Sequence, residues 1–484
     1  MADNTGINAW EQDPGSGAEP GGGALLQRPV PQTGANPFPT SITGSAAPVD
    51  NYSPGTVGFR YWAAADALRR ASDFWGSLLG NHAWNKAIKD SVLPVILDEG
   101  VDLNAYYDRQ ALNFFHASVG GRMVYSGESP DIVCHEFGHA ILDAIRPQLW
   151  DVAALEPPAF HESFGDISAL LTALQLPSVQ IGVLQETNGQ PYRSSRLSRL
   201  AEQLGWAIRQ VQPDAVEPDC LRNAVNSLFY ANPDDLPTSA TASELSSEPH
   251  SFSRVFTGAV FESLALMYMS QPNPTQATLQ QVSVDLATVL LGAIRQAPVV
   301  PEYFAQVGSH MVALAVAKSQ AHGDAVKTAM TKHGILSVPG AVEAATSSTA
   351  TLLESKVGIV TNAAPALPLT EVDVSQYGLT VPKVQMVAAS EPKRFAIAGA
   401  APSAGDLGSV KSDKAALNFF EDLIRRGRLE SGGFFKAQAA IVNTVTLKTH
   451  RLVQEGGQVV LRRIRIDCGL RGHSTGGTSG KKAP

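Results

Sequence analysis

The sequence predicts an α+β protein with a strand-rich N-terminal part, a helical part up to about residue 340, and a small appended α+β module. Short β-branched or alternating runs bounded by Gly and Pro, such as residues 92–99 and 120–127, predict strands. Apolar residues at helical spacing recur through residues 251–336 and predict consecutive helices. Beyond residue 400 the charge becomes basic, with 14 Lys/Arg against 7 Asp/Glu, which marks a separate module.

Composition limits the classes of protein that fit this chain. Its 484 residues suggest two or three domains, and 44% hydrophobic with 17% charged residues is a globular composition. A net charge of −8 shows no overall basic charge of the kind that binds nucleic acid. Because no run of eighteen apolar residues and no signal peptide is readable, we expect no membrane span and a cytoplasmic location. Three cysteines do not make a disulfide framework.

The predicted organisation follows changes in composition along the chain. Residues 1–54 are rich in Gly, Pro and Ser and predict a disordered tail. Residues 55–158 form the N-terminal lobe and 159–340 the helical C-terminal lobe. Residues 345–472 form the basic module, with a hairpin around Gly456-Gly457, and 473–484 a flexible tail. The local charge of +7 indicates either docking to an acidic partner or a solvated basic face.

The segment "DIVCHEFGHAILD" (131–143) carries the main functional pattern. Ser129 is a plausible helix N-cap ahead of it. On a helix His135 and His139, four residues apart, direct their imidazoles to one point. Glu136 lies about a hundred degrees round the helix, where it reaches a metal-bound water without being a ligand. The alternative is an ordinary helix that contains two histidines.

A second motif, "HESFGD" (161–166), strengthens the interpretation as a metal site. Glu162 supplies an oxygen as third ligand, and Asp166 one turn later accepts the other ring N–H of a ligand histidine. The alternative is a helix with two solvent-facing acids. His161 is a rival ligand that points away from this face. Cys134 is interpreted as a buried small residue and not as a ligand.

The two motifs together resemble the thermolysin-like zinc metalloendopeptidases, which are gluzincins. That family has H-E-x-x-H, then a glutamate some twenty residues later with an aspartate four after it. The resemblance covers about residues 58–336 and includes three further segments in family order: "NAYYDR" (104–109), "PHSFSRVFTGAVF" (249–261) and "DAVKTAMTKHGI" (324–335). It implies a two-lobed fold and hydrolysis of peptide or protein substrates.

The resemblance also implies the metal site residue by residue. His135, His139 and Glu162 are the zinc ligands, and Glu136 is the general base that activates the zinc-bound water. Asp166 orients His135, and Asp143 forms a hydrogen bond with His139 on the side of its ring that faces away from the zinc.

Four further residues take roles toward the substrate by the same resemblance. Asn104 and Ala105 pair with substrate backbone as an added strand. His250 stabilises the tetrahedral oxyanion, with Glu244 or Glu248 as its acidic partner. Arg193 contacts the substrate carbonyl.

The chain also departs from the family pattern. Phe252 stands where the family usually has a small polar residue, and Trp150 stands near the position of its tyrosine. The departure at Phe252 supports an alternative, a weak or inactive protease-like scaffold that binds partners and holds a structural zinc. The intact Glu136 argues against it. An aminopeptidase is a third hypothesis, but the glutamate-rich anchor it needs for the substrate amine is not found.

We expect calcium not to be required. Of the family's calcium carboxylates, Asp131 fits the first position, but Ala173 stands at the second. The following loop, residues 174–185, contains no acid. We expect it to pack through apolar side chains instead: Leu174, Leu176, Val179, Ile181 and Val183.

Overall fold

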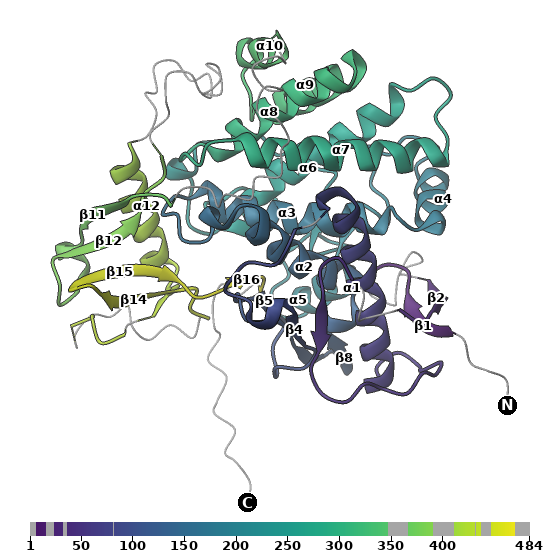
Figure 1. Cartoon of the computed structure of the whole chain (residues 1–484), viewed down its shortest axis with the longest axis horizontal. Coiled ribbons are helices and arrows are strands. Elements are labelled where there is room, and N and C mark those ends of the chain that lie inside the picture. The colour runs from purple at the N-terminus through teal and green to yellow at the C-terminus, as the bar shows by residue number, and fades with distance from the viewer. Residues whose placement is uncertain are drawn as a thin grey trace, which may run out of the picture.

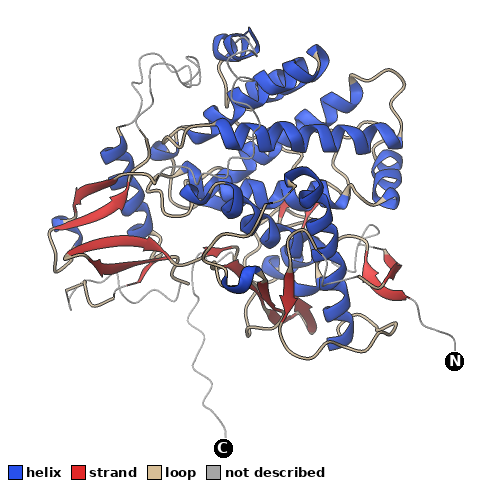
Figure 2. Cartoon of the chain, viewed as in Figure 1, coloured by secondary structure: helices blue, strands red, loops and turns tan. Residues whose placement is uncertain are grey.

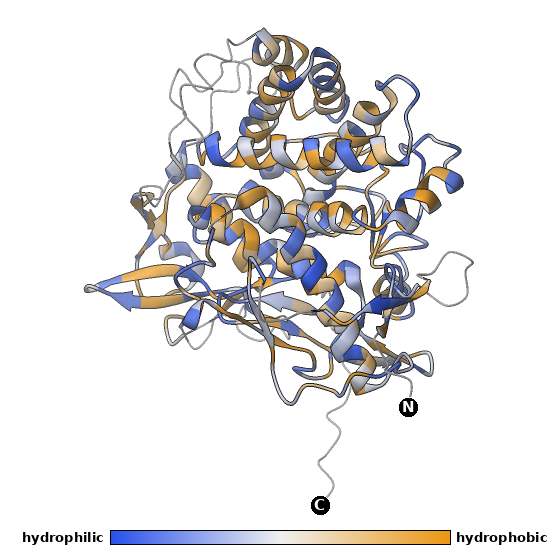
Figure 3. Cartoon of the chain, turned by 45° about the vertical axis from the view of Figure 1, so that its right-hand side comes forward, coloured by the Kyte–Doolittle hydropathy of each residue, from blue (hydrophilic) through white to orange (hydrophobic). Residues whose placement is uncertain are grey.

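The computed structural model describes residues 6–15, 24–31, 36–80, 82–346, 366–390, 411–430, 432–436 and 447–469. As the sequence predicts, the fold is mixed α+β. Figures 1 and 2 show a stack of long helices above several small sheets, with the C-terminal sheet at the left of the view. In Figure 3 most helices carry both hydrophobic and hydrophilic residues, as expected for helices that bury one face.

The N-terminal segment contains strands, so the prediction of a disordered tail over 1–54 was wrong for its described residues. β1 (Gly6–Trp10) and β2 (Leu25–Pro29) form an antiparallel pair. β1 alternates so that Ile7 and Ala9 are buried against helix α1 (Val57–Leu79). Burial of this apolar face offsets the entropic cost of ordering a Gly- and Pro-rich segment.

The central sheet has five strands in the order β16-β5-β6-β4-β3. From the N-terminal part come β3 (Thr40–Ile42), β4 (Leu93–Ile96), β5 (Ala105–Tyr107) and β6 (Leu112–Phe114). The strand beside β5, β16 (Ile466–Asp467), comes from near the other end of the chain. β7 (His116–Val119) and β8 (Arg122–Tyr125) form a separate hairpin. The C-terminal part therefore completes the sheet of the N-terminal part.

Two central helices, α2 (Pro130–Ile145) and α3 (Glu156–Ala173), pack closely against each other. Two glycines permit this approach. A Cβ on Gly138 would lie 2.7 Å from Ser168 Cβ, and one on Gly165 would lie 2.6 Å from the His135 ring. The helical layer above them consists of α6 (Pro249–Met269), α7 (Gln276–Gln296), α8 (Tyr303–Lys318), α9 (Gln320–Lys332) and α10 (Val338–Thr346).

Helix α7 is long and apolar enough to cross a membrane by length and composition alone, but 56% of its apolar window is buried inside the structure. This helix packs against α6 and α8.

The stretch between α3 and α6 has more helix than the sequence suggests. α4 (Pro177–Glu186) occupies the expected acid-free loop, and α5 (Glu202–Arg209) follows between the short strands β9 (Arg199–Leu200) and β10 (Arg222–Asn223). In and before α4 the predicted packing holds for Leu174, Leu176, Val179 and Val183, which are buried. It was wrong for Ile181, which is 43% exposed, because helical periodicity turns this residue to the outside.

The C-terminal module has a second five-stranded sheet in the order β11-β12-β15-β14-β13, covered by helix α12 (Ser412–Arg425). Its strands are β11 (Leu369–Asp373), β12 (Lys383–Val387), β13 (Leu429–Glu430), β14 (His450–Glu455) and β15 (Gln458–Arg463). The predicted hairpin at Gly456-Gly457 joins β14 to β15 and is confirmed. The predicted tail 473–484 lies outside the described residues. Short 3₁₀ turns complete the fold: Lys89–Ser91, Ser126–Glu128, Pro147–Leu149, Pro233–Asp235 and Ser375–Tyr377.

The module is docked on the rest of the chain. Ala153 and Leu155 belong to the module's hydrophobic core, and the Ala153 N–H donates to the Val387 carbonyl at 2.8 Å. Ser247 Oγ donates to Asp422 Oδ1 at 2.8 Å. The module therefore has a fixed position relative to the helices that carry the two sequence motifs.

Candidate metal centre

Helix α2 is built from local signals that place its two histidines side by side. Ser129 is the N-cap and accepts from the Ile132 N–H at 3.4 Å, and Pro130 takes the first helical position. One turn apart on the same face, the rings of His135 and His139 lie 4.7 Å apart, centroid to centroid. Both side chains are buried, at 5% and 0% exposure.

Helix α3 brings a carboxylate to the two imidazoles. Glu162 Oε2 lies 3.3 Å from His135 Nε2, and Glu162 Oε1 lies 3.8 Å from His139 Nε2. The close packing at Gly138 and Gly165 makes this approach possible. The three residues predicted as ligands therefore lie next to one another, with a different Glu162 oxygen nearer to each imidazole.

Asp166 orients His135, as predicted. Its Oδ1 lies 3.0 Å from His135 Nδ1, which leaves His135 Nε2 facing Glu162. Arg222 holds the same carboxylate with two hydrogen bonds, at 2.9 and 2.7 Å. Burial opposes ionisation of Asp166, but Arg222 and His135 outweigh it and hold the Asp166 pKa well below its usual range.

The charge on His135 depends on the same carboxylates. Burial alone lowers the pKa of an imidazole, but Asp166 and Glu162 raise the His135 pKa to about 9. Without a metal ion, His135 is therefore protonated at neutral pH. A metal that binds there displaces this proton.

Glu136 lies beside the cluster with a free carboxylate. The side chain is 0% exposed, and neither oxygen has a hydrogen-bond partner within the described part of the chain. Burial raises the Glu136 pKa to about 7, against the opposing effects of His135 and of the Cys468 thiol. A thiol is only a weak donor, so a buried carboxylate with no stronger partner is costly, which indicates that the group faces a species absent from the polypeptide itself.

His250 also points into the site, from the start of α6. Its Nε2 lies 3.3 Å from Glu162 Oε2, and its Nδ1 lies 2.8 Å from Glu248 Oε1. Of the two acidic partners that the sequence leaves open, Glu248 is in place, whereas Glu244 is exposed. Glu248 also caps α6 by accepting from Ser251 N–H, so helix and imidazole are fixed by the same carboxylate.

Two predicted residues are not where the resemblance implies. Asp143 does not contact His139; its carboxylate accepts from Tyr107 Oη at 3.0 Å and from Arg109 Nε at 2.9 Å. His139 Nδ1 has no hydrogen-bond partner among the described residues. The pairing with His139 was wrong because a charged guanidinium from the loop after β5 takes the Asp143 carboxylate.

The prediction that Arg193 is a site residue was also wrong. It is exposed on a turn, where its N–H donates to the Gln190 carbonyl. The buried arginine of the site is Arg222, from β10. No local spacing marks Arg222, because 56 residues separate it from Asp166.

The other residues considered as possible site residues pack in the protein interior and do not belong to the metal centre. Cys134 is buried, with its Sγ 3.7 Å from the Ala67 carbonyl. Phe252 stacks on Phe304 in the core at 5.2 Å, and Trp150 packs against Tyr107. The ring of His161 lies 5.8 Å from that of His139, outside the group of donor atoms that meet.

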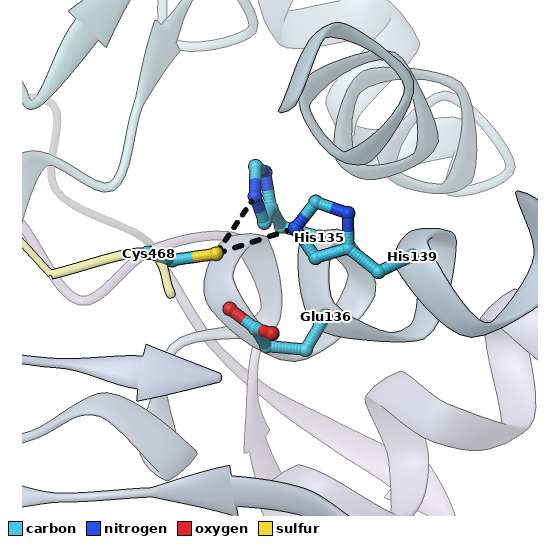
Figure 4. Close-up of side chains that lie close together, drawn as sticks. All are labelled: His135, Glu136, His139 and Cys468. Atoms are coloured by element: carbon cyan, nitrogen blue, oxygen red, sulfur yellow. Dashed lines mark hydrogen bonds between the residues drawn. The ribbon is translucent and has the colours of Figure 1, made fainter. Parts of the chain in front are cut away.

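The donor atom that the sequence did not predict is the sulfur of Cys468. Its Sγ lies 3.2 Å from His139 Nε2, 3.5 Å from His135 Nε2 and 3.9 Å from Glu162 Oε2. Figure 4 shows the sulfur directed between the two imidazoles, with Glu136 beside it. No signal in the sequence separates Cys468 from the other two cysteines, because it lies more than 300 positions from every residue it meets here.

The backbone around Cys468 occupies the edge of β5. Ile466 pairs with Tyr107 and Asp467 with Tyr106 in antiparallel register, and the Cys468 N–H donates to the Ala105 carbonyl at 3.0 Å. Asn104 Nδ2 donates to Asp467 Oδ1 at 2.8 Å. The two residues predicted to bind substrate backbone therefore contact the chain's own C-terminal segment.

The cluster as a whole is buried, and it is placed to hold a metal ion. Donor atoms of His135, Glu136, His139 and Cys468 lie within 4.8 Å of one another, as do those of Glu162, His250 and Cys468. Ligand atoms around a tetrahedral zinc ion, with bonds of 2.0–2.3 Å, are about 3.3–3.6 Å apart. The distances from Cys468 Sγ and from the two Glu162 oxygens to the neighbouring donor atoms, from 3.2 to 3.9 Å, are close to these values.

A pocket beside His135 has a polar side formed by Asp131, Glu136, Asp166, Arg222 and Cys468. Its apolar walls are Ala105, Ile132, Ala169, Leu200, Ala201, Leu204 and Leu221.

No protein-family model matches the chain, and no curated protein matches it by sequence.

Proposed function

We propose that the chain is a zinc-dependent endopeptidase. The observation that carries the proposal is the close approach of the Glu162 carboxylate to both His135 and His139, with the buried carboxylate of Glu136 beside them. The resemblance of these motifs to thermolysin-like enzymes supports the same chemistry and a two-lobed arrangement of the fold.

The donor set suits zinc. Two imidazole nitrogens and one carboxylate oxygen are the ligands of a known class of catalytic zinc site. A zinc ion held by these residues supplies Lewis acidity, which polarises the substrate carbonyl and lowers the pKa of water to near 7.

The remaining residues handle protons and position the peptide. Glu136, with a pKa of about 7, is suited to take a proton from the attacking water and to pass it to the leaving amine. His250, fixed by Glu248, stabilises the negative charge that develops on the carbonyl oxygen. Asn104 and Ala105 lie at the edge of β5 to which a substrate backbone would add as a strand in place of β16.

Hydrolysis of casein and of quenched peptides by the full-length protein tests this proposal. Because Cys468 contacts the cluster, the assay uses both the wild-type chain and Cys468→Ser. We expect hydrolysis that 1,10-phenanthroline abolishes and added zinc restores. If neither protein cleaves any substrate while zinc is bound, the proposed function is wrong.

A second candidate function is a binding protein with a structural zinc. One observation favours it: Cys468 provides a fourth donor, and closed four-ligand sites are typical of structural zinc. The unpartnered Glu136 argues against it, because a structural site has no use for a buried base. Release of peptidase activity by Cys468→Ser would decide between the two.

A further inference from the structure

We propose that Cys468 is a fourth ligand of the metal centre and that β16, with Cys468, is an internal inhibitor that occupies the substrate position. The assignment as a ligand rests on the donor cluster alone, whereas the inhibitory role rests on the proposed peptidase function.

The first support is the backbone pairing of β16 with β5. β5 has β6 on one side and β16 on the other, so β16 takes the free edge of the sheet next to the metal centre. A peptide that binds by strand addition needs this same edge. With β16 in place, the Ala105 carbonyl is already paired with Cys468 N–H.

The second support is a set of side chains that hold the segment in register. Asp467 is buried and binds both Asn104 and Arg428. The next residue, Gly469, lies on Asn104, where an added Cβ would be 2.5 Å from its Cγ. Since Asn104 is only 2% exposed, it has little room to move away. These contacts are specific for the sequence Asp-Cys-Gly.

The third support is the anchoring of the module just before this segment. β15 ends at Arg463, and only two residues lie between it and the start of β16. Arg463 donates from Nε to the Trp150 carbonyl at 2.6 Å, and its N–H donates to Asp151 Oδ1 at 3.0 Å. Arg465 lies over the Tyr106 ring at 4.7 Å. The docked module thus delivers the thiol to the donor cluster.

The chemistry of the cluster explains why this arrangement would prevent catalysis at the site. A catalytic zinc centre keeps one position open for water or substrate. A thiolate in that position closes the coordination sphere, and a metal ion deprotonates a coordinating thiol outright. Cys468 is 7% exposed and the other donors are 5% exposed or less, so a peptide cannot reach the centre while the segment is bound.

Without a metal bond, the same distances describe a thiol that merely donates a hydrogen bond to His139. Cobalt substitution separates the two cases. The full-length protein loaded with Co²⁺ should show a sulfur-to-cobalt charge-transfer band in the near ultraviolet. Cys468→Ser should retain cobalt and lose the band, and Cys134→Ala, which changes the cysteine next to His135, should keep it.

Peptidase assays of the zinc-loaded proteins test inhibition. We expect Cys468→Ser to raise the turnover of a quenched peptide by at least about tenfold, because a catalytic zinc site needs an open position. Asp467→Ala combined with Cys468→Ser should raise it further, since Asn104 and Arg428 then release the strand. A synthetic peptide with the sequence of residues 463–469 should inhibit the double variant, and its Cys→Ser version should inhibit it less.

Each outcome bears on one of the two claims. Absence of the band from cobalt-loaded wild-type protein would overturn the assignment of Cys468 as a ligand. Equal turnover in wild type and Cys468→Ser would overturn the inhibitory role. A band that depends on Cys468, with no hydrolysis by any variant, would support the ligand and overturn the proposed peptidase function instead.

Discussion

The sulfur of Cys468 lies 3.2 Å from Nε2 of His139, although 329 positions separate the two residues in the sequence. The C-terminal module therefore reaches into a site that the two helical motifs build. All site residues predicted from the sequence lie before residue 340, and this contact adds a residue from the module.

Removing one ligand should release the metal. His139→Ala leaves His135, Glu162 and Cys468, and we expect purified protein to contain far less zinc than the wild type, because a structural or catalytic zinc site needs all of its protein ligands. Metal analysis by atomic emission measures this directly. His116→Ala, a partly exposed histidine outside the cluster, is the control. Equal zinc in all three proteins would refute the site.

Glu136→Gln should keep zinc and lose catalysis. The amide preserves the shape of the side chain but cannot accept a proton, so we expect turnover to fall at least about a hundredfold, the lower range for a general base. The turnover of proteins with and without Glu136→Gln should be compared when both also carry Cys468→Ser, because this second substitution removes the proposed inhibition. Unchanged turnover with normal zinc content would take Glu136 out of the mechanism.

Asp166→Asn should weaken zinc binding, because Asp166 holds His135 in its ligating orientation. Loss of such a partner costs about 10–100-fold in metal affinity. Asp143→Asn is the matched comparison. Its carboxylate contacts Tyr107 and Arg109 but not His139, so we expect unchanged zinc affinity. Competition against a fluorescent zinc chelator measures both variants, and similar losses in the two would contradict this assignment.

Glu156 should make stability fall as pH rises. Burial raises its pKa to about 8, although Tyr230 Oη and the Phe304 N–H both donate to the carboxylate. Because the folded-state pKa lies above the unfolded value, the stabilising contribution is complete below about pH 4.5 and is lost as pH rises through 8. We expect a loss of the order of 3 kcal/mol between pH 5 and 8.

Urea unfolding of Glu156→Gln at both pH values measures that contribution. The free-energy difference between wild type and variant should shrink, or change sign, from pH 5 to pH 8. Glu343→Gln, at an exposed position on α10, should show no such trend. A difference that is constant with pH would mean that Glu156 ionises in the folded state as it does in the unfolded state.

Calcium should not raise the thermal stability. The residues after Glu162 that would hold calcium form helix α4 instead of an acidic loop, and four of the five predicted apolar side chains are buried in this helix or just before it. Asp131 accepts from the Ala201 N–H at 3.1 Å. Thermal unfolding in a calcium-selective chelator and in millimolar calcium is the measurement. A rise of many degrees with calcium would show that other ligands exist.

The parts of the site that could be predicted are those that depend on local spacing. The i, i+4 pairs His135–His139 and Glu162–Asp166 lie on one helix each, so helical geometry fixes their relative positions. Capping by Ser129 and the hairpin at Gly456-Gly457 are local in the same way.

The parts that could not be predicted depend on competition between distant groups. Asp143 has three possible partners nearby, and only the fold shows that Arg109 and Tyr107 hold it. Arg222 and Cys468 arrive from other elements, with no periodicity that relates them to the motifs. The order in residues 6–15 likewise depends on packing against α1, which a composition rich in glycine does not reveal.

The basic charge of the module has a partial explanation within the chain. Arg426 lies 3.5 Å from Glu248, Arg428 binds Asp467, and Arg462 lies 3.5 Å from Asp151. These arginines contact acids of the same polypeptide. An acidic partner for the module stays a prediction, and it would have to bind the remaining basic residues.

The two-residue connection between β15 and β16 has a thermodynamic consequence. A segment tethered so closely experiences an effective concentration of the order of millimolar or more. Occupancy of about 99% then needs an intrinsic dissociation constant of only about 10 μM, which is weak for a segment that forms a sheet pairing and contacts a metal centre. If the tether were cut, a segment with that affinity would dissociate at concentrations well below about 10 μM. One hydrolysed bond between Arg463 and Ile466 would thus convert a nearly saturated intramolecular equilibrium into a dilute intermolecular one.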